Sequence, residues 1–298
     1  MPGKILVSGA SGPIGKALLP ALHERGYEAA RLVRRPAVGA GQIQWHPKRP
    51  VNPDSVSGFD AVVHLAGESI VGRWTAAKKA AIRASRVLGT RHLAEALAKA
   101  PNPPRVLVAA SAIGYYGDRG EELLREDSTP GQGFLAEVCQ QWEAATTPAA
   151  QAGIRVVHLR IGMVLSPAGG ALAAMLTPFR LGLGGRIGSG RQWWSWIDVG
   201  DLVAVIRYAI ETESLRGPVN AVSPNPVSNS EFTRALAKVL ARPAIFPLPS
   251  FAARLALGQM ADELLLASQR VDPTRLLAGG FQFRYPDLAA SLQANLAK

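Results

Sequence analysis

The sequence predicts an α/β fold built on a doubly wound parallel sheet, with a small, mainly helical region at the C-terminal end. Short apolar runs typical of buried strands alternate with helical periodicity through the first two thirds of the chain. This alternation favours parallel strands joined by helices that cover both faces of the sheet. In addition, the first strand passes within ten residues into a glycine-rich turn and then a helix.

This first strand, turn and helix lie between Lys4 and Arg25. In such a unit the first glycine permits the tight turn, the second lets backbone amides approach a ligand, and the third lets helix and strand pack closely. Pro13 suits the first helical position, and the free N–H groups there favour an anion such as a pyrophosphate. The turn therefore predicts a dinucleotide site in a Rossmann fold. Its candidate residues are Gly9, Ser11, Gly12, Pro13, Ile14 and Gly15.

The second strand, residues 28–33, is followed by Arg34 and Arg35. In a site for NAD, this strand ends in an acidic residue that holds the ribose 2′-hydroxyl. Here two guanidinium groups take that place, and their fixed donor geometry suits a 2′-phosphate. We therefore predict NADP(H) as the cofactor, bound by these arginines. The alternative is an ordinary basic loop in a basic protein.

A third strand, within residues 60–67, runs into a turn of small residues that would let a nucleotide lie against the backbone. A long helix over 75–99 follows, and Arg86 on this helix would reach the cofactor side if it is not simply a surface or interhelix group. The further candidate cofactor residues are Leu65, Ala66, Gly67, Glu68 and Arg86.

The remaining elements continue the alternation. We expect strands over 43–45, 105–111, 155–160 and 218–222, and helices over 134–152, 171–181, 199–212, 229–240, 250–257, 260–268, 273–277 and 287–296. Asp198 is predicted to cap the helix over 199–212, with Asp201 near its positive end, and Ser228 with Glu231 forms a capping box. The glycine-rich stretch 182–190 is predicted to be a mobile wall of the substrate cleft.

On this pattern the chain divides after residue 242. Residues 1–242 are predicted to form the NADP-binding Rossmann domain, with substrate-side insertions around 166–197. Residues 243–298 are predicted to form a small C-terminal domain, in which prolines separate short helices.

Composition narrows the class of protein. The chain has 298 residues, 48% of them hydrophobic, which suffices for one large domain and a smaller one. Its net charge of +11 comes from scattered Lys and Arg residues without a nucleic-acid motif, so no nucleic-acid partner is expected. No apolar run reaches the length of a membrane span, no signal peptide is recognisable and Cys139 is the single cysteine. We therefore expect a cytoplasmic protein without a membrane partner. No spacing typical of metal ligands is present, so no metal is expected. The sequence leaves open whether the protein forms a homodimer.

Taken together, the turns resemble the short-chain dehydrogenase/reductase superfamily in its extended, epimerase-like branch. The resemblance covers nearly the whole chain and is carried by residues 9–15, 65–68, 73–75, 84–86, 111–117, 178–185 and 225–232. The tail, from 266–271 to 283–286, is similar to the small domain of unknown function that ends one atypical group of this family. The resemblance implies a Rossmann fold and NADP(H) binding and leaves the substrate undefined.

The catalytic pair expected from this resemblance is missing. In extended members a Tyr, with a Lys four residues later, moves the proton of the substrate oxygen, and the lysine lowers the pKa of that tyrosine. Counted from Pro130, the two positions hold Phe134 and Val138, which have neither a proton to transfer nor a charge. The partner hydroxyl is displaced as well, because the family spacing falls on Ala112 and the serine, Ser111, precedes it.

Few groups offer a replacement. Tyr115 or Tyr116 would supply a phenol, Ser111 would bond a substrate carbonyl, and Glu137 would act as a base if it is not simply an exposed helix residue. We name Ser111, Tyr115 and Tyr116 as the catalytic candidates. Two functions are open: an NADP(H)-dependent oxidoreductase or epimerase with an altered proton relay, and a catalytically silent protein that binds or senses NADP(H).

Overall fold

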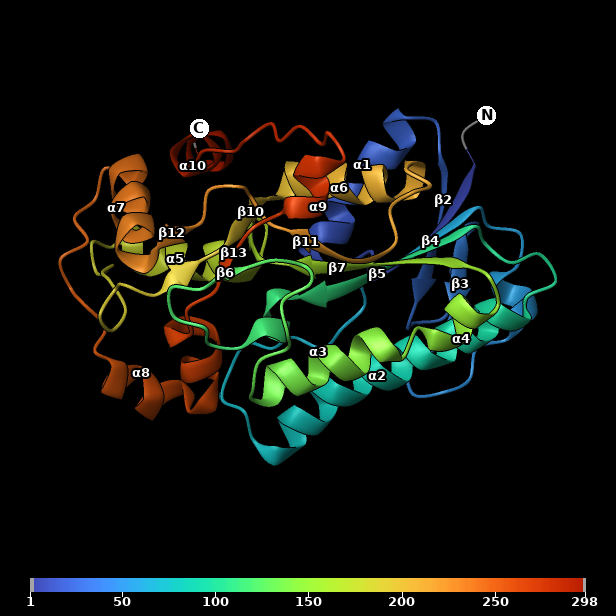
Figure 1. Cartoon of the computed structure of the whole chain (residues 1–298), viewed down its shortest axis with the longest axis horizontal. Helices are drawn as coiled ribbons and strands as arrows, with labels where there is room; N and C mark the ends of the chain where they lie inside the picture. The colour runs from blue at the N-terminus through green and yellow to red at the C-terminus, as the bar shows by residue number, and fades with distance from the viewer. Residues whose placement is uncertain (1–2, 297–298) are drawn as a thin grey trace.

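A seven-stranded parallel sheet forms the centre of the computed structural model, which describes residues 3–296 (Figure 1). Its strands, from one edge to the other, are β11 (Gly217–Ala221), β7 (Arg155–Ile161), β5 (Val106–Ala112), β4 (Ala61–His64), β1 (Lys4–Ser8), β2 (Glu28–Val33) and β3 (Gln42–Gln44). Every neighbouring pair is parallel. The chain winds outward from β1 to β3 and then returns to β4 on the other side of β1. The predicted doubly wound sheet is confirmed, and its switch point lies between β1 and β4.

Helices cover both faces of this sheet (Figure 1). On one face lie α1 (Pro13–Glu24) and α6 (Val199–Glu211), and on the other α2 (Ala76–Lys99), α3 (Phe134–Ala144) and α4 (Thr147–Gln151). Successive strand residues point to opposite faces. Ile5 and Val7 therefore pack with Leu18 of α1, whereas Leu6 packs with Leu93 of α2.

The segment expected to be one helix over 134–152 is two helices, α3 and α4. Pro148 has no N–H to continue the helical ladder. The hydroxyls of Thr146 and Thr147 donate to the carbonyl oxygens of Glu143 and Ala144 instead. These local bonds end α3, and α4 begins at Thr147.

The remaining elements lie outside the central sheet and the helices described above. The helices are α5 (Gly170–Arg180), α7 (Asn229–Leu240), α8 (Ser250–Leu257), α9 (Thr274–Ala278) and α10 (Leu288–Leu296), with 3-10 segments η1 (Pro53–Val56) and η2 (Ile113–Tyr116) and the π-helical η3 (Ala261–Leu266). The short strands are β6 (Leu123–Leu124), β8 (Met163–Leu165), β9 (Trp193–Trp194), β10 (Trp196–Asp198), β12 (Val227–Ser228) and β13 (Arg270–Val271). Within the described residues, no helix is both long and apolar enough to cross a membrane.

The C-terminal segment packs against several parts of the preceding chain. Strand β13 pairs with β6, α10 packs on α7, and Leu276 of α9 belongs to the main core. Asp198 caps α6 as predicted and also accepts a hydrogen bond from Ser291, while Asp201 accepts the backbone N–H groups of Arg284 and Tyr285. Both carboxylates therefore tie the C-terminal segment to α6. The domain boundary after residue 242 stays a prediction.

Candidate functional site

The glycine turn between β1 and α1 is closed so tightly that side chains are excluded from it. Gly9 has φ of +71°, and a Cβ there would lie 2.7 Å from the carbonyl carbon of Leu65. A Cβ on Gly15 would lie 2.5 Å from the carbonyl oxygen of Gly9. No side chain caps α1, whose N-cap is Gly12. The turn therefore offers uncapped amides at the positive end of a helix, which is a suitable place for a pyrophosphate.

Basic groups gather around Glu68, beyond the end of β4. Lys78 Nζ lies 2.8 Å from Glu68 Oε1, and Arg86 Nη1 donates to the carbonyl oxygen of Glu68 at 2.9 Å. The hydrogen bond from Lys78 holds the pKa of Glu68 below its usual value, and the charges of Arg34 and Arg86 act in the same direction. The segments after β2 and β4, together with α2, thus bring Arg34, Glu68 and Arg86 close enough for the two arginines to act on the carboxylate.

Two further residues, Lys78 and Gly169, lie near this part of the structure and were not predicted from the sequence. Lys78 stands two helical turns before Arg86 on α2, a spacing that puts both side chains on one face and was a usable signal. Gly169, before α5, lies against the glycine turn, because a Cβ on it would be 2.6 Å from Pro13 Cγ. This contact joins residues that are far apart in the chain, so no local sequence pattern predicts it.

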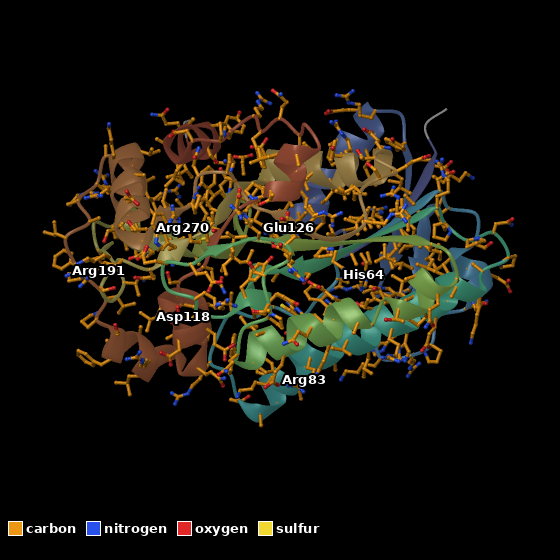
Figure 2. The ribbon with its side chains drawn as sticks, viewed as in Figure 1. His64, Arg83, Asp118, Glu126, Arg191 and Arg270 are labelled. Atoms are coloured by element: carbon orange, nitrogen blue, oxygen red, sulfur yellow. The ribbon has the colours of Figure 1, made fainter. Side chains whose placement is uncertain are left out.

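A buried histidine, His64, lies beneath the turn that follows β4. Ser8 Oγ accepts the backbone N–H groups of Leu65 (3.1 Å) and Ala66 (3.3 Å) and lies 2.6 Å from His64 Nδ1. Because this oxygen already accepts two amides, its own proton points to Nδ1. His64 lies between the sheet and α3 (Figure 2) and has no exposed surface. The backbone of the β4 turn is therefore held by a side-chain pair, Ser8 and His64.

The other ring nitrogen extends this network to α2 and α3. His64 Nε2 donates to Thr90 Oγ1 at 3.0 Å, and the same oxygen accepts the indole N–H of Trp142 at 2.9 Å. Burial lowers the pKa of His64 to about 4, so the ring is neutral at neutral pH. A neutral imidazole fits this network, because it accepts a hydrogen bond at one ring nitrogen and donates a hydrogen bond from the other.

This pKa predicts a pH dependence of stability. Because the folded pKa is about 4 and the ordinary value is 6.5, the folded protein binds fewer protons between these values, and the free energy of unfolding falls as pH drops through this window. The loss assigned to His64 is about 3 kcal/mol. Urea unfolding from pH 7 to pH 4 measures it: in His64→Gln the stability depends less steeply on pH than in the wild type. Parallel pH curves for the two proteins would contradict this assignment.

Two of the three catalytic candidates are engaged in a buried polar cluster. Ser111 Oγ donates to Glu143 Oε1 at 2.7 Å, and Arg160 forms a bidentate pair with Glu143 at 2.9 and 3.0 Å. Arg160 also donates to the phenol of Tyr116 at 3.0 Å, which in turn donates to Asn220 Oδ1 at 2.7 Å. Burial raises the pKa of Tyr116 to about 12 although Arg160 lies beside it. These contacts hold the hydroxyls of Ser111 and Tyr116 in the interior, and the catalytic role of each stays a prediction.

The third candidate, Tyr115, differs from them. Its ring is half-buried and lies over the Arg160 guanidinium, with Cζ 3.5 Å from the ring centroid. Among the described residues, its hydroxyl makes no hydrogen bond. The register of β5 with β7 runs unbroken through Ser111 and Ala112.

Phe134 and Val138 are packed in an apolar cluster with Trp74, whose ring lies 5.3 Å from that of Phe134. The start of α3 is capped from a distance: Glu263 of η3 accepts the N–H groups of Phe134 (3.0 Å) and Leu135 (2.7 Å). Beside this cap lies a cavity of about 250 Å³. Its lining residues include Gly114, Asp118, Gln132, Leu135, Glu263 and Gln269. The C-terminal segment therefore helps to enclose the space next to the replaced catalytic positions.

The stretch 182–190 is bonded to the C-terminal segment. The N–H of Gly188 donates to the carbonyl oxygen of Leu248 at 2.9 Å. The N–H of Leu248 donates to the carbonyl oxygen of Arg186, also at 2.9 Å. The expectation that this stretch is a mobile wall stays a prediction.

Two family models match the chain. The model of the NAD dependent epimerase/dehydratase family matches residues 5–221, and a model of a domain of unknown function matches residues 248–294. Over 290 residues the chain is 43% identical to the epimerase family protein Mb2239 of Mycobacterium bovis, with 97% of this chain and 96% of the relative covered. It is 38% identical to the human epimerase family protein SDR39U1, with 99% and 100% covered.

Solved structures are similar over the same extent. The crystal structure of human SDR39U1 with NADPH superimposes with a TM-score of 0.90 at 37% identity, and 98% of each chain is covered. A nucleoside-diphosphate sugar epimerase from Corynebacterium glutamicum superimposes with a TM-score of 0.83 at 41% identity, with 99% of this chain and 58% of that chain covered.

Proposed function

Because the chain belongs to the NAD dependent epimerase/dehydratase family, we propose that it binds NADP(H) and serves hydride transfer to or from a small substrate, with a proton relay other than the family's Tyr and Lys. The observation that carries the proposal is the edge of the sheet at β1 and β2. Uncapped amides of α1 suit a pyrophosphate, and Arg34 and Arg35 stand where NAD-specific sites place a carboxylate. The human relative was solved with NADPH, which supports the same choice.

Within this proposal the cofactor residues keep the roles predicted from the sequence. Gly9, Gly12 and Gly15 shape the turn, and Arg34 and Arg35 bind the 2′-phosphate. Leu65, Ala66 and Gly67 lie under the nucleotide, where the Ser8–His64 pair fixes their backbone. Lys78 and Arg86 add positive charge beside Glu68.

We propose Tyr115 as the proton donor. NADPH supplies a hydride to a carbonyl carbon, so the carbonyl oxygen must take a proton from the chain or from water. Tyr116 and Ser111 have their hydroxyls in the buried cluster, whereas the hydroxyl of Tyr115 makes no hydrogen bond to any described residue. Arg160, stacked on the Tyr115 ring, holds that ring in place.

The test is turnover with a panel of sugar nucleotides and small carbonyl compounds, read as loss of NADPH absorbance. Tyr115→Phe is expected to lower kcat by roughly a hundredfold or more while the affinity for NADPH stays unchanged. Tyr208→Phe is the matched control, because this hydroxyl bonds the carbonyl oxygen of Gly279, away from the glycine turn. A Tyr115→Phe enzyme as fast as the wild type would remove Tyr115 from the relay.

The second function, a protein that binds NADP(H) without consuming it, is favoured by Phe134 and Val138. Both side chains are packed in the apolar cluster with Trp74. This function predicts NADPH binding with a change in hydrogen exchange near α3 and η3, and no NADPH oxidation with any compound of the panel. Oxidation with a single compound would exclude it.

A further inference from the structure

One end of the molecule carries an unusual concentration of exposed apolar side chains. It contains α8, the segment 241–249 that leads to it, and the stretch 181–188 (Figure 1, left). Six large apolar side chains there are between 55% and 76% exposed: Leu181, Leu183, Ile245, Phe246, Phe251 and Leu255. We call this set the apolar tip.

The parts of the apolar tip adjoin one another, because α8 follows directly on segment 241–249 and this segment is bonded to the stretch 181–188. The N–H of Phe246 donates to the carbonyl oxygen of Gly184 at 3.1 Å, which places the two segments side by side. Phe251 and Leu255 stand one turn apart on α8 and share its outer face, whereas Ala253 and Leu257 face inward. A helix with two large apolar residues turned to solvent leaves an apolar face without a partner.

The charged residues within the segments that form the apolar tip are all basic. Residues 166–197 and 232–261 hold no Asp or Glu, and their basic residues are Arg180, Arg186, Arg191, Arg234, Lys238, Arg242 and Arg254. Arg254 is paired with Asp262 at 2.7 Å. Arg180, Arg186, Arg191 and Arg242 make no ion pair with any described residue, and Arg191 lies at this end of the molecule (Figure 2).

We propose that the apolar tip docks on an anionic phospholipid surface, with Phe251 and Leu255 entering the interface and the arginines meeting the headgroups. Exposed aromatic and aliphatic side chains flanked by unpaired cations are the features by which a protein lies on such a membrane without spanning it. The sequence predicted no membrane partner because it has no spanning segment; a surface contact needs none.

Charge and shape favour lipid over the other occupants. A second copy would bring the same cations opposite one another with no acidic residue from these segments to pair them. An apolar peptide in a groove would need a concave surface, whereas the apolar tip presents side chains that project into solvent.

Vesicle co-sedimentation of the full chain tests the proposal. We expect binding to vesicles of phosphatidylcholine mixed with phosphatidylserine, weak binding to phosphatidylcholine alone, and a loss of binding as salt rises. Phe251→Ser combined with Leu255→Ser is expected to lower the partition coefficient roughly a hundredfold. Arg180→Gln combined with Arg242→Gln is expected to remove the preference for the anionic vesicles.

Leu277→Ser is the matched control, since Leu277 on α9 is exposed outside the apolar tip. Circular dichroism of each variant checks that the fold is intact. The NADPH affinity of each variant is measured separately, so that a failure of cofactor binding is distinguished from a failure of vesicle binding. Absence of wild-type binding to both vesicle types would overturn the proposal. A second result would also overturn it. In this result the wild type is a dimer in sedimentation velocity, the variant with both Phe251→Ser and Leu255→Ser is a monomer, and vesicles bind neither of the two proteins.

Discussion

Replacing Arg34 and Arg35 together by alanine is expected to weaken NADPH binding roughly a hundredfold and to leave NADH binding nearly unchanged. The two arginines follow β2 directly, and both are exposed. Each charge-assisted hydrogen bond to a phosphate is worth roughly tenfold in affinity, and only NADPH carries a 2′-phosphate. Fluorescence titration with both cofactors measures the two affinities.

The matched control for this pair is Arg49→Ala, an exposed arginine elsewhere in the chain. It removes one charge from the same basic surface without touching the end of β2, and we expect little effect on either cofactor. An equal loss of NADPH and NADH affinity in the Arg34 and Arg35 variant would mean that these arginines do not read the 2′-phosphate.

Replacing Glu143 by glutamine is expected to lower the free energy of unfolding by about 3–5 kcal/mol, because it leaves the buried Arg160 charge without its partner. The side chains of Arg160 and Glu143 are only 4% and 13% exposed. Burial alone would lower the pKa of Arg160, but the hydrogen bonds and charge of Glu143 raise it above its ordinary value. The substitution also removes the carboxylate that accepts the Ser111 hydroxyl.

Glu137→Gln on the same helix is the control for this loss. It breaks an exposed pair with Arg83, and such pairs contribute about 1 kcal/mol or less. Urea unfolding of both variants gives the comparison. Equal losses would show that the buried pair is no more important than the exposed one.

The residues proposed to bind the cofactor were easier to predict from the sequence than the surroundings of the catalytic candidates. Gly9, Gly12 and Gly15 lie within one strand–turn–helix unit, so their spacing predicts the local backbone geometry without knowledge of the rest of the fold. The strand that ends before Arg34 is equally local. By contrast, no local pattern gave the partners of Ser111 and Tyr116. Glu143 is 32 residues from Ser111, and Asn220 is 104 residues from Tyr116.

The sequence by itself determined the alternation of strands and helices, the glycine turn and the helix caps at Asp198 and Ser228, because each depends on residues within a few positions. Only the tertiary structure decided which hydroxyls stay free. The strand order sets β5 beside β7, so Arg160 reaches Glu143 and Tyr116. The same packing brings Glu263 to the start of α3 from 129 residues away. Such contacts follow from the arrangement of the sheet and its covering helices, which spacing along the chain does not record.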